Sequence, residues 1–449
     1  MVKLAILADD LTGANDTGAC FAGYGFRTEL LLSLQMCDAI YENQDNVPQV
    51  ISLDVRSRGL AQSAAYSSTL HAVQAVKAYS PERLYKKMDS AIRGHFPQEC
   101  DAVLEESGLQ LGFVAPAYPA MNRTTVGGVH YIGDVPVHET ELSQDPLTPV
   151  TDSRIQIVLE RGSRFPVGYI PLELLKEGSE EALQREVIAQ VEQGCRLIAV
   201  DAVTDEHLDR LLALADELPL TSFFAGSAGL AEAMARRMAW DLPEHSADQP
   251  ILHGEPMLVA AGSQTKLTRE QLLHAMEHTG HELVPVTLDM LFEAHRLAAE
   301  QCVKVQRSAG ERLASGQDVI LQLMPDEGGA GVAELTLRYD CRTSEDFHQQ
   351  VTERFGKFVG SVYLQSGMQG SIYVIGGETA RGVCEALGLR QLRIVRAISH
   401  GAIVSEGCLS SSGGTSITLI TKSGSFGKAS AVTDIVQYPR ARVRGSGDQ

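Results

Sequence analysis

Short apolar runs alternate with longer amphipathic stretches through the first half of the chain. The run at 4–8 is continuous, which is typical of a strand buried on both faces of a parallel sheet. Similar runs lie at 49–53, 83–87, 111–115 and 196–200. Helical patterns lie between or after them, at 62–78, 97–107 and 205–218. This repeated order of strand and helix predicts right-handed crossovers and a parallel sheet covered by helices.

The same alternation resumes later, with strand-like runs at 257–261, 318–323, 371–375 and 417–421. The stretch 240–256 that precedes them contains three prolines and several polar residues, as linkers do. We therefore predict an α/β protein with domains at 1–240 and 257–449 and a linker at 241–256. Each domain is expected to be a largely parallel sheet covered by helices. A catalytic cleft between the domains would close about the linker.

One segment, 118–152, interrupts the pattern. It is rich in proline, glycine and threonine and shows no helical periodicity. A long irregular segment inside a compact domain is usually functional or disordered. Its aromatic residues and spaced glycines favour an ordered hairpin or lid. Arg123, His130 and Asp145 belong to this segment. They could lie in a plain loop or in a lid over the substrate, and the sequence leaves both alternatives open.

Two adjacent acids follow the first strand. Asp9 and Asp10 come directly after it, and Gly13 and a helix from about Ala14 come next. Ligands of open parallel sheets bind beyond the carboxyl ends of the strands. The two acids therefore indicate a polar small molecule, a metal or a catalytic proton transfer. The alternative is that they only cap the first turn of the helix.

Further charged residues follow two other strands. Arg56 and Arg58 come after the run at 49–53, and we expect one of them to face the same edge and the other to face solvent. Lys87, Asp89, Ser90 and Arg93 come at the end of the run at 83–87. Cations suit a carboxylate there, and Asp89 and Ser90 suit hydroxyl groups. The alternative is that Asp89 is a helix N-cap neutralised by Arg93.

Glycine-containing turns follow three strands of the second half, at 262–263, 376–379 and 423–427. Glycine lets backbone N–H groups approach phosphate closely. Each turn alone is also compatible with an ordinary passage from strand to helix. Three of them at one sheet edge would form a nucleotide cradle.

Composition narrows the function further. The 449 residues are 44% hydrophobic and carry a net charge of −19, which disfavours non-specific binding to nucleic acid and to anionic membranes. The eight cysteines are scattered and form no C-x-x-C pair, and no H-E-x-x-H or similar metal spacing occurs. Without a signal-peptide core or a long apolar run, we expect a cytoplasmic protein. A homo-oligomer is compatible with the sequence.

Several segments together resemble the four-carbon acid sugar kinases, a family long labelled only as a domain of unknown function. The matching motifs are A-D-D-L-T-G-A-N-D at 8–16, K-K-M-D-S-A-I-R-G at 86–94, P-A-Y-P-A-M-N-R-T at 116–124, G-G-E-T at 376–379 and K-S-G-S-F-G at 422–427. The resemblance implies an N-terminal substrate domain and a C-terminal nucleotide domain. It also implies that ATP phosphorylates threonate, erythronate or 3-oxo-tetronate on the terminal hydroxyl.

The resemblance also implies residue roles. Asp10 would bind the sugar acid and act as the general base, with Asp9 as the alternative base. The other implied substrate ligands are Arg58, Lys87, Met88, Asp89, Ser90 and Arg93. The implied nucleotide ligands are Ser263, Gly376, Gly377, Glu378, Thr379, Ser423, Gly424, Ser425, Phe426 and Gly427. Ile92, Thr265 and Ser425 depart mildly from the family pattern.

The expected chemistry is phosphoryl transfer, which depends on positioning and charge stabilisation. Mg²⁺ would bridge the phosphates with one or two protein carboxylates, for which Asp16 and Glu378 are candidates. The resemblance favours D-threonate as the substrate, with D-erythronate and 3-oxo-tetronate as alternatives. A sensor that binds without turnover is a more distant alternative. An NAD-dependent oxidoreductase is a rival interpretation, but the sequence does not contain the G-x-G-x-x-G fingerprint of such enzymes.

Overall fold

The computed structural model describes residues 2–34, 47–145, 148–241, 256–326, 328–368, 370–399, 401–409, 415–424 and 426–445. The chain divides into two compact units, residues 1–247 and 248–449. Most of the predicted linker, residues 242–255, lies outside the described residues. Within the described ranges, no helix combines the length and the apolar character needed to cross a membrane.

The first unit is built on a parallel sheet. Its strands are β1 (Leu4–Ala8), β2 (Thr28–Leu31), β3 (Val50–Asp54), β4 (Arg83–Lys87), β5 (Leu111–Ala115), β9 (Val167–Ile170), β10 (Leu197–Val200) and β11 (Ser222–Gly226). They lie in the order β2-β3-β1-β4-β11-β5-β10-β9, and every neighbouring pair is parallel. All five residues of β1 are buried, as expected for a strand covered on both faces.

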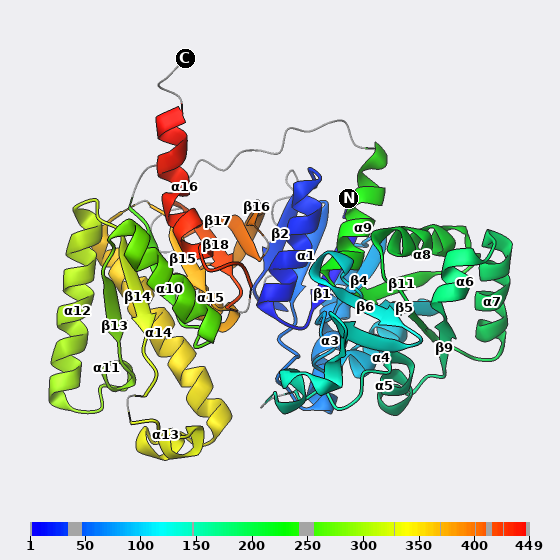
Figure 1. Ribbon diagram of the computed structural model, residues 1–449, viewed down its shortest axis with the longest axis horizontal. Coiled ribbons are helices and arrows are strands. Elements are labelled where there is room, and N and C mark those ends of the chain that lie inside the picture. Colours follow the sequence, from blue (N-terminus) through cyan, green and yellow to red (C-terminus); the bar gives the residue numbers. More distant parts are fainter. Residues whose placement is uncertain are drawn as a thin grey trace. The chain divides into compact units, whose positions relative to one another are not determined.

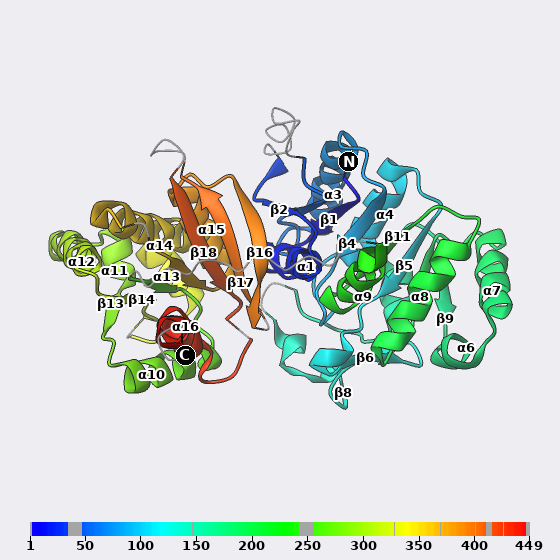
Figure 2. The same ribbon diagram turned by 90° about the horizontal axis from the view of Figure 1, so that it is seen from above.

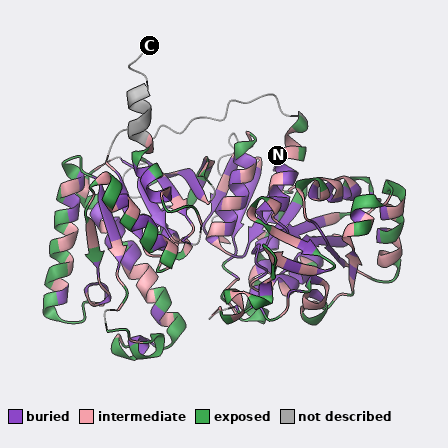
Figure 3. Cartoon of the chain, viewed as in Figure 1, coloured by how far each residue is buried: buried purple, intermediate pink, exposed green. Residues whose placement is uncertain are grey.

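Helices cover both faces of this sheet (Figures 1 and 2). They are α1 (Leu11–Gly23), α3 (Gln62–Lys77), α4 (Phe96–Ser107), α5 (Ile155–Gly162), α6 (Leu172–Glu177), α7 (Glu180–Glu192), α8 (Asp205–Glu217) and α9 (Ala228–Met238). Residues of α3, α4 and α5 join one hydrophobic core, and residues of α1 and of α6 to α9 join another. The buried strands between these two layers of helices are visible in Figure 3.

The segment predicted to be a hairpin or lid is a small antiparallel sheet. Its strands are β6 (Arg123–Val126), β7 (Val129–Ile132) and β8 (Val135–Pro136). Short 3₁₀ helices flank it at Pro119–Met121, Val137–Glu139 and Glu141–Gln144. The prediction of an ordered hairpin is therefore confirmed.

The second unit has a mixed sheet of seven strands. These are β12 (Leu258–Ala261), β13 (Leu283–Val286), β14 (Val319–Leu323), β15 (Ile372–Ile375), β16 (Gln391–Ser399), β17 (Ala402–Cys408) and β18 (Ser416–Lys422). They lie in the order β13-β14-β12-β15-β18-β17-β16. Neighbouring strands are parallel among β13, β14, β12, β15 and β18. Strand β17 is antiparallel to both of its neighbours, β18 and β16.

The helices of the second unit again form two layers. They are α10 (Lys266–Thr279), α11 (Leu288–Phe292), α12 (Arg296–Ala314), α13 (Val332–Arg338), α14 (Ser344–Ser366), α15 (Gly377–Ala386) and α16 (Ala431–Gly445). Side chains of α10 and α16 pack into one core with the sheet. Helices α12, α14 and α15 lie on the other face (Figure 2).

The strands and helices that the sequence predicted are present, most of them with bounds within one residue. The first helix differs more, because it begins at Leu11 and not at about Ala14. Asp10 caps it and so allows the earlier start. Strands β2, β9, β11, β13, β16 and β17 were not predicted. Of these, β13 carries Pro285, which an edge strand tolerates and which hides the strand pattern.

Candidate functional site

The carboxyl ends of three neighbouring strands carry the candidate substrate residues. Ala8, the last residue of β1, pairs with Asp54 of β3 on one side and with Lys87 of β4 on the other. The segments that begin at Asp9, Val55 and Met88 therefore leave the sheet side by side. This register brings the predicted residues of the first unit together at one edge.

Arg58 joins both acids of the first strand end. Its Nε donates to Asp9 Oδ2 at 2.8 Å, and its Nη2 donates to Asp9 Oδ1 at 3.0 Å. Its Nη1 donates to Asp10 Oδ2 at 2.5 Å. The other oxygen of Asp10 accepts a hydrogen bond from the N–H of Gly13 at 2.7 Å. Asp10 thus caps α1, as the simpler interpretation of the sequence held, and also takes part in the charged cluster.

Positive charge surrounds Asp9. Burial alone would raise the pKa of its carboxyl, but the charges of Arg58, Lys86 and Lys87 outweigh burial and lower it. Asp9 therefore stays ionised and held by Arg58. The contacts of Asp9 therefore suit a role in positioning Arg58. They suit the role of proton acceptor less well.

Lys87 lies against the first turn of α1. Its Nζ is 2.9 Å from the place that a Cβ on Gly13 would occupy, so a larger residue at position 13 would collide with it. The same ammonium donates to the carbonyl of Met88 at 2.7 Å. The side chains of Lys87 and Met88 are both buried. A cation is therefore fixed between the end of β4 and the start of α1.

Asp89 and Arg93 form the next contact. Arg93 Nε donates to Asp89 Oδ2 at 2.7 Å, and Arg93 Nη1 donates to Asp145 Oδ2 at 3.2 Å. Burial would raise the pKa of Asp89, but Arg58 and Arg93 lower it well below its usual range. Asp89 is not the cap of α4, because that helix begins at Phe96 with His95 as its N-cap. The N-cap interpretation of Asp89 is therefore wrong.

Two residues of the small antiparallel sheet support Ser90. Arg123 Nη1 donates to Ser90 Oγ. His130 Nε2 lies 2.9 Å from the carbonyl of Ser90, and its Nδ1 lies 2.9 Å from Thr125 Oγ1. Burial lowers the pKa of His130 to about 4, so the ring is neutral at pH 7. Arg123 and His130 thus belong to this site. The sequence marked their segment only as a loop or lid.

A buried ion pair lies beneath the cluster. Lys86 Nζ is 3.1 Å from Glu99 Oε2, and both side chains are fully buried. Ser57 Oγ donates to the other Glu99 oxygen. The same ammonium donates to the carbonyl of Lys87 at 2.7 Å. The contacts of Glu99 with Lys86 and Ser57 tie β4 and the segment after β3 to helix α4.

Asp16 differs from the other acids of the first unit's cluster. It lies on α1, one turn beyond Gly13, and no hydrogen bond or ion pair to its carboxylate is found in the described part of the chain. Burial raises its pKa to about 7, the charge of Lys87 opposes this rise, and the charge of Asp10 adds to it. Asp16 can therefore exchange a proton near neutral pH, unlike Asp9 and Asp89.

Three loops meet at the carboxyl edge of the second sheet. Ile375 of β15 pairs with Ala261 of β12 and with Lys422 of β18, so the loops that follow these strands are neighbours. Gly376 has a φ of +117°, and a Cβ there would lie 3.4 Å from the backbone nitrogen of Ser263. A Cβ on Gly424 would lie 2.0 Å from Ser263 Oγ. These glycines let the three loops approach one another closely.

Hydroxyl groups fill the space between these loops. Thr268 Oγ1 donates to Ser263 Oγ at 2.9 Å, and Thr265 Oγ1 donates to the carbonyl of Gly424 at 2.8 Å. Thr379 is buried in the first turn of α15. The predicted nucleotide residues Ser263, Gly376, Gly377, Thr379, Ser423 and Gly424 are thus gathered at one edge, as the sequence predicted.

The remaining predicted nucleotide residues are more peripheral. Arg381 Nη2 donates to Glu378, whose side chain is exposed. Gln271 Nε2 donates to the carbonyl of Phe426 at 3.1 Å, which fixes the loop that continues to Gly427. Ser425 lies outside the described residues.

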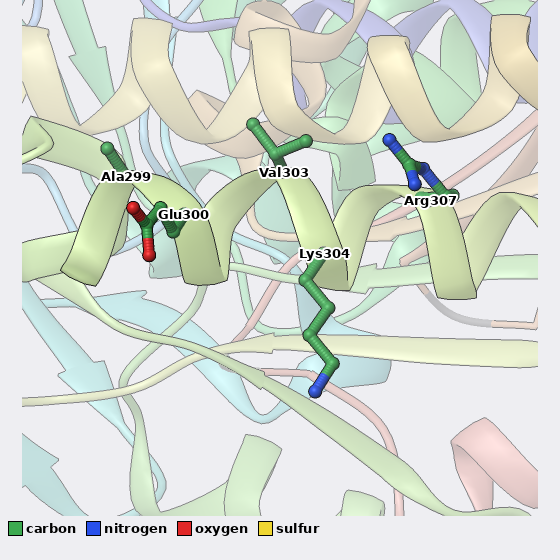
Figure 4. A pocket seen from close by; sticks show the side chains of 5 residues that line it. All are labelled: Ala299, Glu300, Val303, Lys304 and Arg307. Carbon is green, nitrogen blue, oxygen red and sulfur yellow. The ribbon is translucent and has the colours of Figure 1, made fainter. Parts of the chain in front are cut away.

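The described ranges contain no group of three or more His, Cys, Asp or Glu side chains that could hold a metal ion. A pocket lies on α12 and is lined by Ala299, Glu300, Val303, Lys304 and Arg307. Ala299, Val303 and Arg307 point to one side of the helix, and Lys304 points to the opposite side (Figure 4). None of these five residues comes from a loop that follows a strand, so we do not count this pocket as part of the candidate site.

Comparison with known proteins agrees with this division of residues. A family model described as a sugar-binding N-terminal domain matches residues 4–234. A model described as a nucleotide-binding C-terminal domain matches residues 258–432. The first match includes the Arg58 cluster, and the second includes the three glycine-containing loops.

Several curated proteins are similar over nearly their whole length. A D-threonate kinase from Salmonella typhimurium is 30% identical over 441 residues, which cover 97% of this chain and 98% of that protein. A D-erythronate kinase from Heliobacterium modesticaldum is 30% identical over 455 residues, covering 99% and 98%. A 3-oxo-tetronate kinase from Pseudomonas fluorescens is 30% identical over 445 residues, covering 94% of each.

Two solved structures share the fold. A Salmonella typhimurium LT2 protein superimposes with a TM-score of 0.78 at 22% identity, covering 97% of this chain and 99% of that one. A Haemophilus influenzae protein of the DUF1537 family superimposes with a TM-score of 0.70 at 20% identity, covering 97% and 99%.

Proposed function

The chain belongs to the family of four-carbon acid sugar kinases, and we propose that it transfers the γ-phosphoryl group of ATP to the terminal 4-hydroxyl of D-threonate. The observation that carries the proposal is the cluster at the edge of β1, β3 and β4. Three cations, Arg58, Lys87 and Arg93, surround the acids and the hydroxyl that would bind a small hydroxy acid. D-Erythronate and 3-oxo-tetronate are the alternative substrates, since relatives with those names are similarly close.

The contacts suggest how the substrate is held. Arg58 and Lys87 present the donors that a carboxylate needs, and a planar guanidinium suits a carboxylate especially well. Asp89 and Ser90 offer acceptors to the inner hydroxyl groups, while Arg93, Arg123 and His130 hold those two residues in place. The terminal hydroxyl then lies toward Asp10 and the start of α1.

Two carboxylates compete for the role of proton acceptor. Asp10 is the acceptor predicted from the sequence, but both of its oxygens already accept hydrogen bonds, from Gly13 and Arg58. Asp10 can accept a proton only when the substrate replaces it as the hydrogen-bond partner of Arg58. Asp16 makes no such contact in the described residues, and its pKa of about 7 matches that of an effective general base.

ATP and Mg²⁺ are the proposed cofactors. The three loops with Ser263, Gly376 and Gly424 supply the backbone and hydroxyl donors of a phosphate site. Bound Mg²⁺ would neutralise charge on the phosphates and hold them for transfer. Asp16 would serve as a ligand only if Asp10 is the proton acceptor, because a bound cation keeps a carboxylate ionised. Glu378 is held by Arg381 and fits a metal ligand less well.

The test is release of ADP, measured by a coupled assay with D-threonate, D-erythronate, L-threonate and 3-oxo-tetronate. We expect the highest kcat/KM with D-threonate. A higher value with one of the other acids would move the specificity to that acid. Binding of a sugar acid without ADP release would contradict the proposal.

A further inference from the structure

Lys422 is a buried cation in the second unit that the sequence did not assign. It is the last residue of β18 and pairs with Ile375 of β15, so it stands at the sheet edge from which the loops after β12, β15 and β18 leave. Only 3% of the residue's surface is exposed. Its Nζ donates to the carbonyl of Ser423 at 2.8 Å. Its Cε is 3.4 Å from the place that a Cβ on Gly427 would occupy.

No acid balances this cation. Among the described residues, no carboxylate lies within 4.0 Å of Lys422 Nζ. The other charged side chains nearby in the sequence, Lys428 and Asp434, pair with each other at 3.2 Å. Glu378, at the start of α15, is held by Arg381. Burial lowers the pKa of Lys422 to about 8, and no charged group contributes to that shift.

A buried ammonium without a counter-charge is costly, because removal from water is compensated only by pairing. A stable protein would replace such a lysine with an apolar residue unless an anion binds there. The surroundings fit an anion. The first turn of α15 has no side-chain cap, so its N–H groups remain available, and the hydroxyl groups of Ser263 and Thr268 lie in the same loop cluster.

We propose that Lys422 is a direct ligand of the nucleotide's polyphosphate, and that the phosphates supply the counter-charge that the described residues do not provide. This inference deepens the proposed function and depends on it, since it assumes that ATP is the phosphoryl donor. It assigns to Lys422 the recognition of phosphate charge, while the hydroxyl and backbone donors of the three loops orient the phosphates.

The test compares nucleotide binding by the wild-type protein and by Lys422→Met, which keeps the length of the side chain and removes its charge. Isothermal titration calorimetry with ATP, ADP and adenosine measures the affinities. We expect ATP and ADP to bind about 10- to 100-fold more weakly to Lys422→Met, as for loss of a charge-assisted hydrogen bond. Adenosine affinity should not change, and Lys422→Arg should recover part of the phosphate affinity.

Lys428→Met is the matched control. Lys428 lies six positions further along, but its side chain is exposed and paired with Asp434. The Lys428→Met protein should bind ATP, ADP and adenosine with the affinities of the wild type. The thermal stability of the ligand-free proteins gives a second readout. Since an unbalanced buried charge destabilises the protein, Lys422→Met should melt higher than the wild type.

Proton uptake keeps the proposal testable even if Lys422→Met does not fold. Near pH 8.5 part of the wild-type Lys422 is neutral, so ATP binding should draw in protons, which calorimetry in buffers of different ionisation enthalpy detects. ATP binding by the wild type without proton uptake would overturn the assignment. Equal ATP affinity of Lys422→Met and wild type would do the same. Failure of the wild type to bind ATP would instead count against the proposed function.

Discussion

Arg58 holds Asp9 by two hydrogen bonds, from Nε at 2.8 Å and from Nη2 at 3.0 Å, and reaches Asp10 with its remaining nitrogen. The first two bonds use the planar fork of the guanidinium and fix its orientation. The third bond is the one that a substrate carboxylate could replace. Asp9 thus orients the arginine, and Asp10 keeps its outer nitrogen occupied in the absence of substrate.

Arg58→Lys should weaken turnover of the sugar acid without loss of the fold. Lysine keeps the charge but cannot contact Asp9 with two nitrogens and the substrate with a third. We expect kcat/KM for D-threonate to fall by about 10- to 100-fold, with the larger part in KM. Steady-state kinetics measure this. Arg56→Lys, in the same segment but with a more exposed side chain, is the control and should behave like the wild type.

The two candidate proton acceptors can be separated by their pH profiles. If Asp16 accepts the proton, kcat/KM should rise with pH and level off above about pH 7, the pKa of its carboxyl. Asp16→Asn should then lose this rise and about 100-fold or more of kcat. A wild-type profile in Asp16→Asn, together with a comparable loss in Asp10→Asn, would return the role to Asp10.

Stability provides a control for this experiment. The pKa of Asp16 is raised on folding, so the folded protein binds more protons than the unfolded chain between about pH 4 and pH 7. Its stability should therefore fall as the pH rises through that range. Asp16→Asn should remove this fall, so that its gain in urea midpoint over the wild type is larger at pH 8 than at pH 4. A kinetic effect without this stability signature would mean that the raised pKa of Asp16 is not the cause of the pH profile.

The Lys86–Glu99 pair should support the cluster without touching the substrate. Lys86→Met leaves Glu99 buried with only the Ser57 hydroxyl, and we expect a loss of about 3–5 kcal/mol in the free energy of unfolding. Lys86→Met with Glu99→Leu removes both charges and should recover most of the loss. Urea denaturation measures both variants. Equal destabilisation of the single and double variants would mean that packing, not the charge pair, is responsible.

Much of the candidate site could be predicted from the positions in the sequence at which strands end. Asp9, Asp10, Lys87 and Asp89 could be placed together because parallel strands bring their carboxyl ends to one edge, and the three glycine-containing loops followed from the same rule. Contacts between distant segments could not be predicted. His130 and Arg123 reach Ser90 only because the small antiparallel sheet folds over that segment.

The pKa values of the charged side chains and their partners could not be predicted from the sequence either. Asp16 has the same side chain as Asp9, but only the structure shows that burial raises the pKa of Asp16, whose carboxylate has no partner among the described residues, while Asp9 is held by Arg58. Lys422 likewise stands in a motif that was recognised, but the sequence could not show that it is buried with no carboxylate of the described residues beside it. These properties depend on burial and on neighbours from other elements.

The proton-coupled ³¹P spectrum of the product made from ATP and D-threonate tests the central claim most directly, because it shows both the transfer and its position. We predict that ADP forms together with one new phosphomonoester signal, split by the two protons of the terminal carbon. A signal split by a single proton would place the phosphate on an inner hydroxyl. The absence of any new phosphomonoester would contradict the assignment of D-threonate as the substrate.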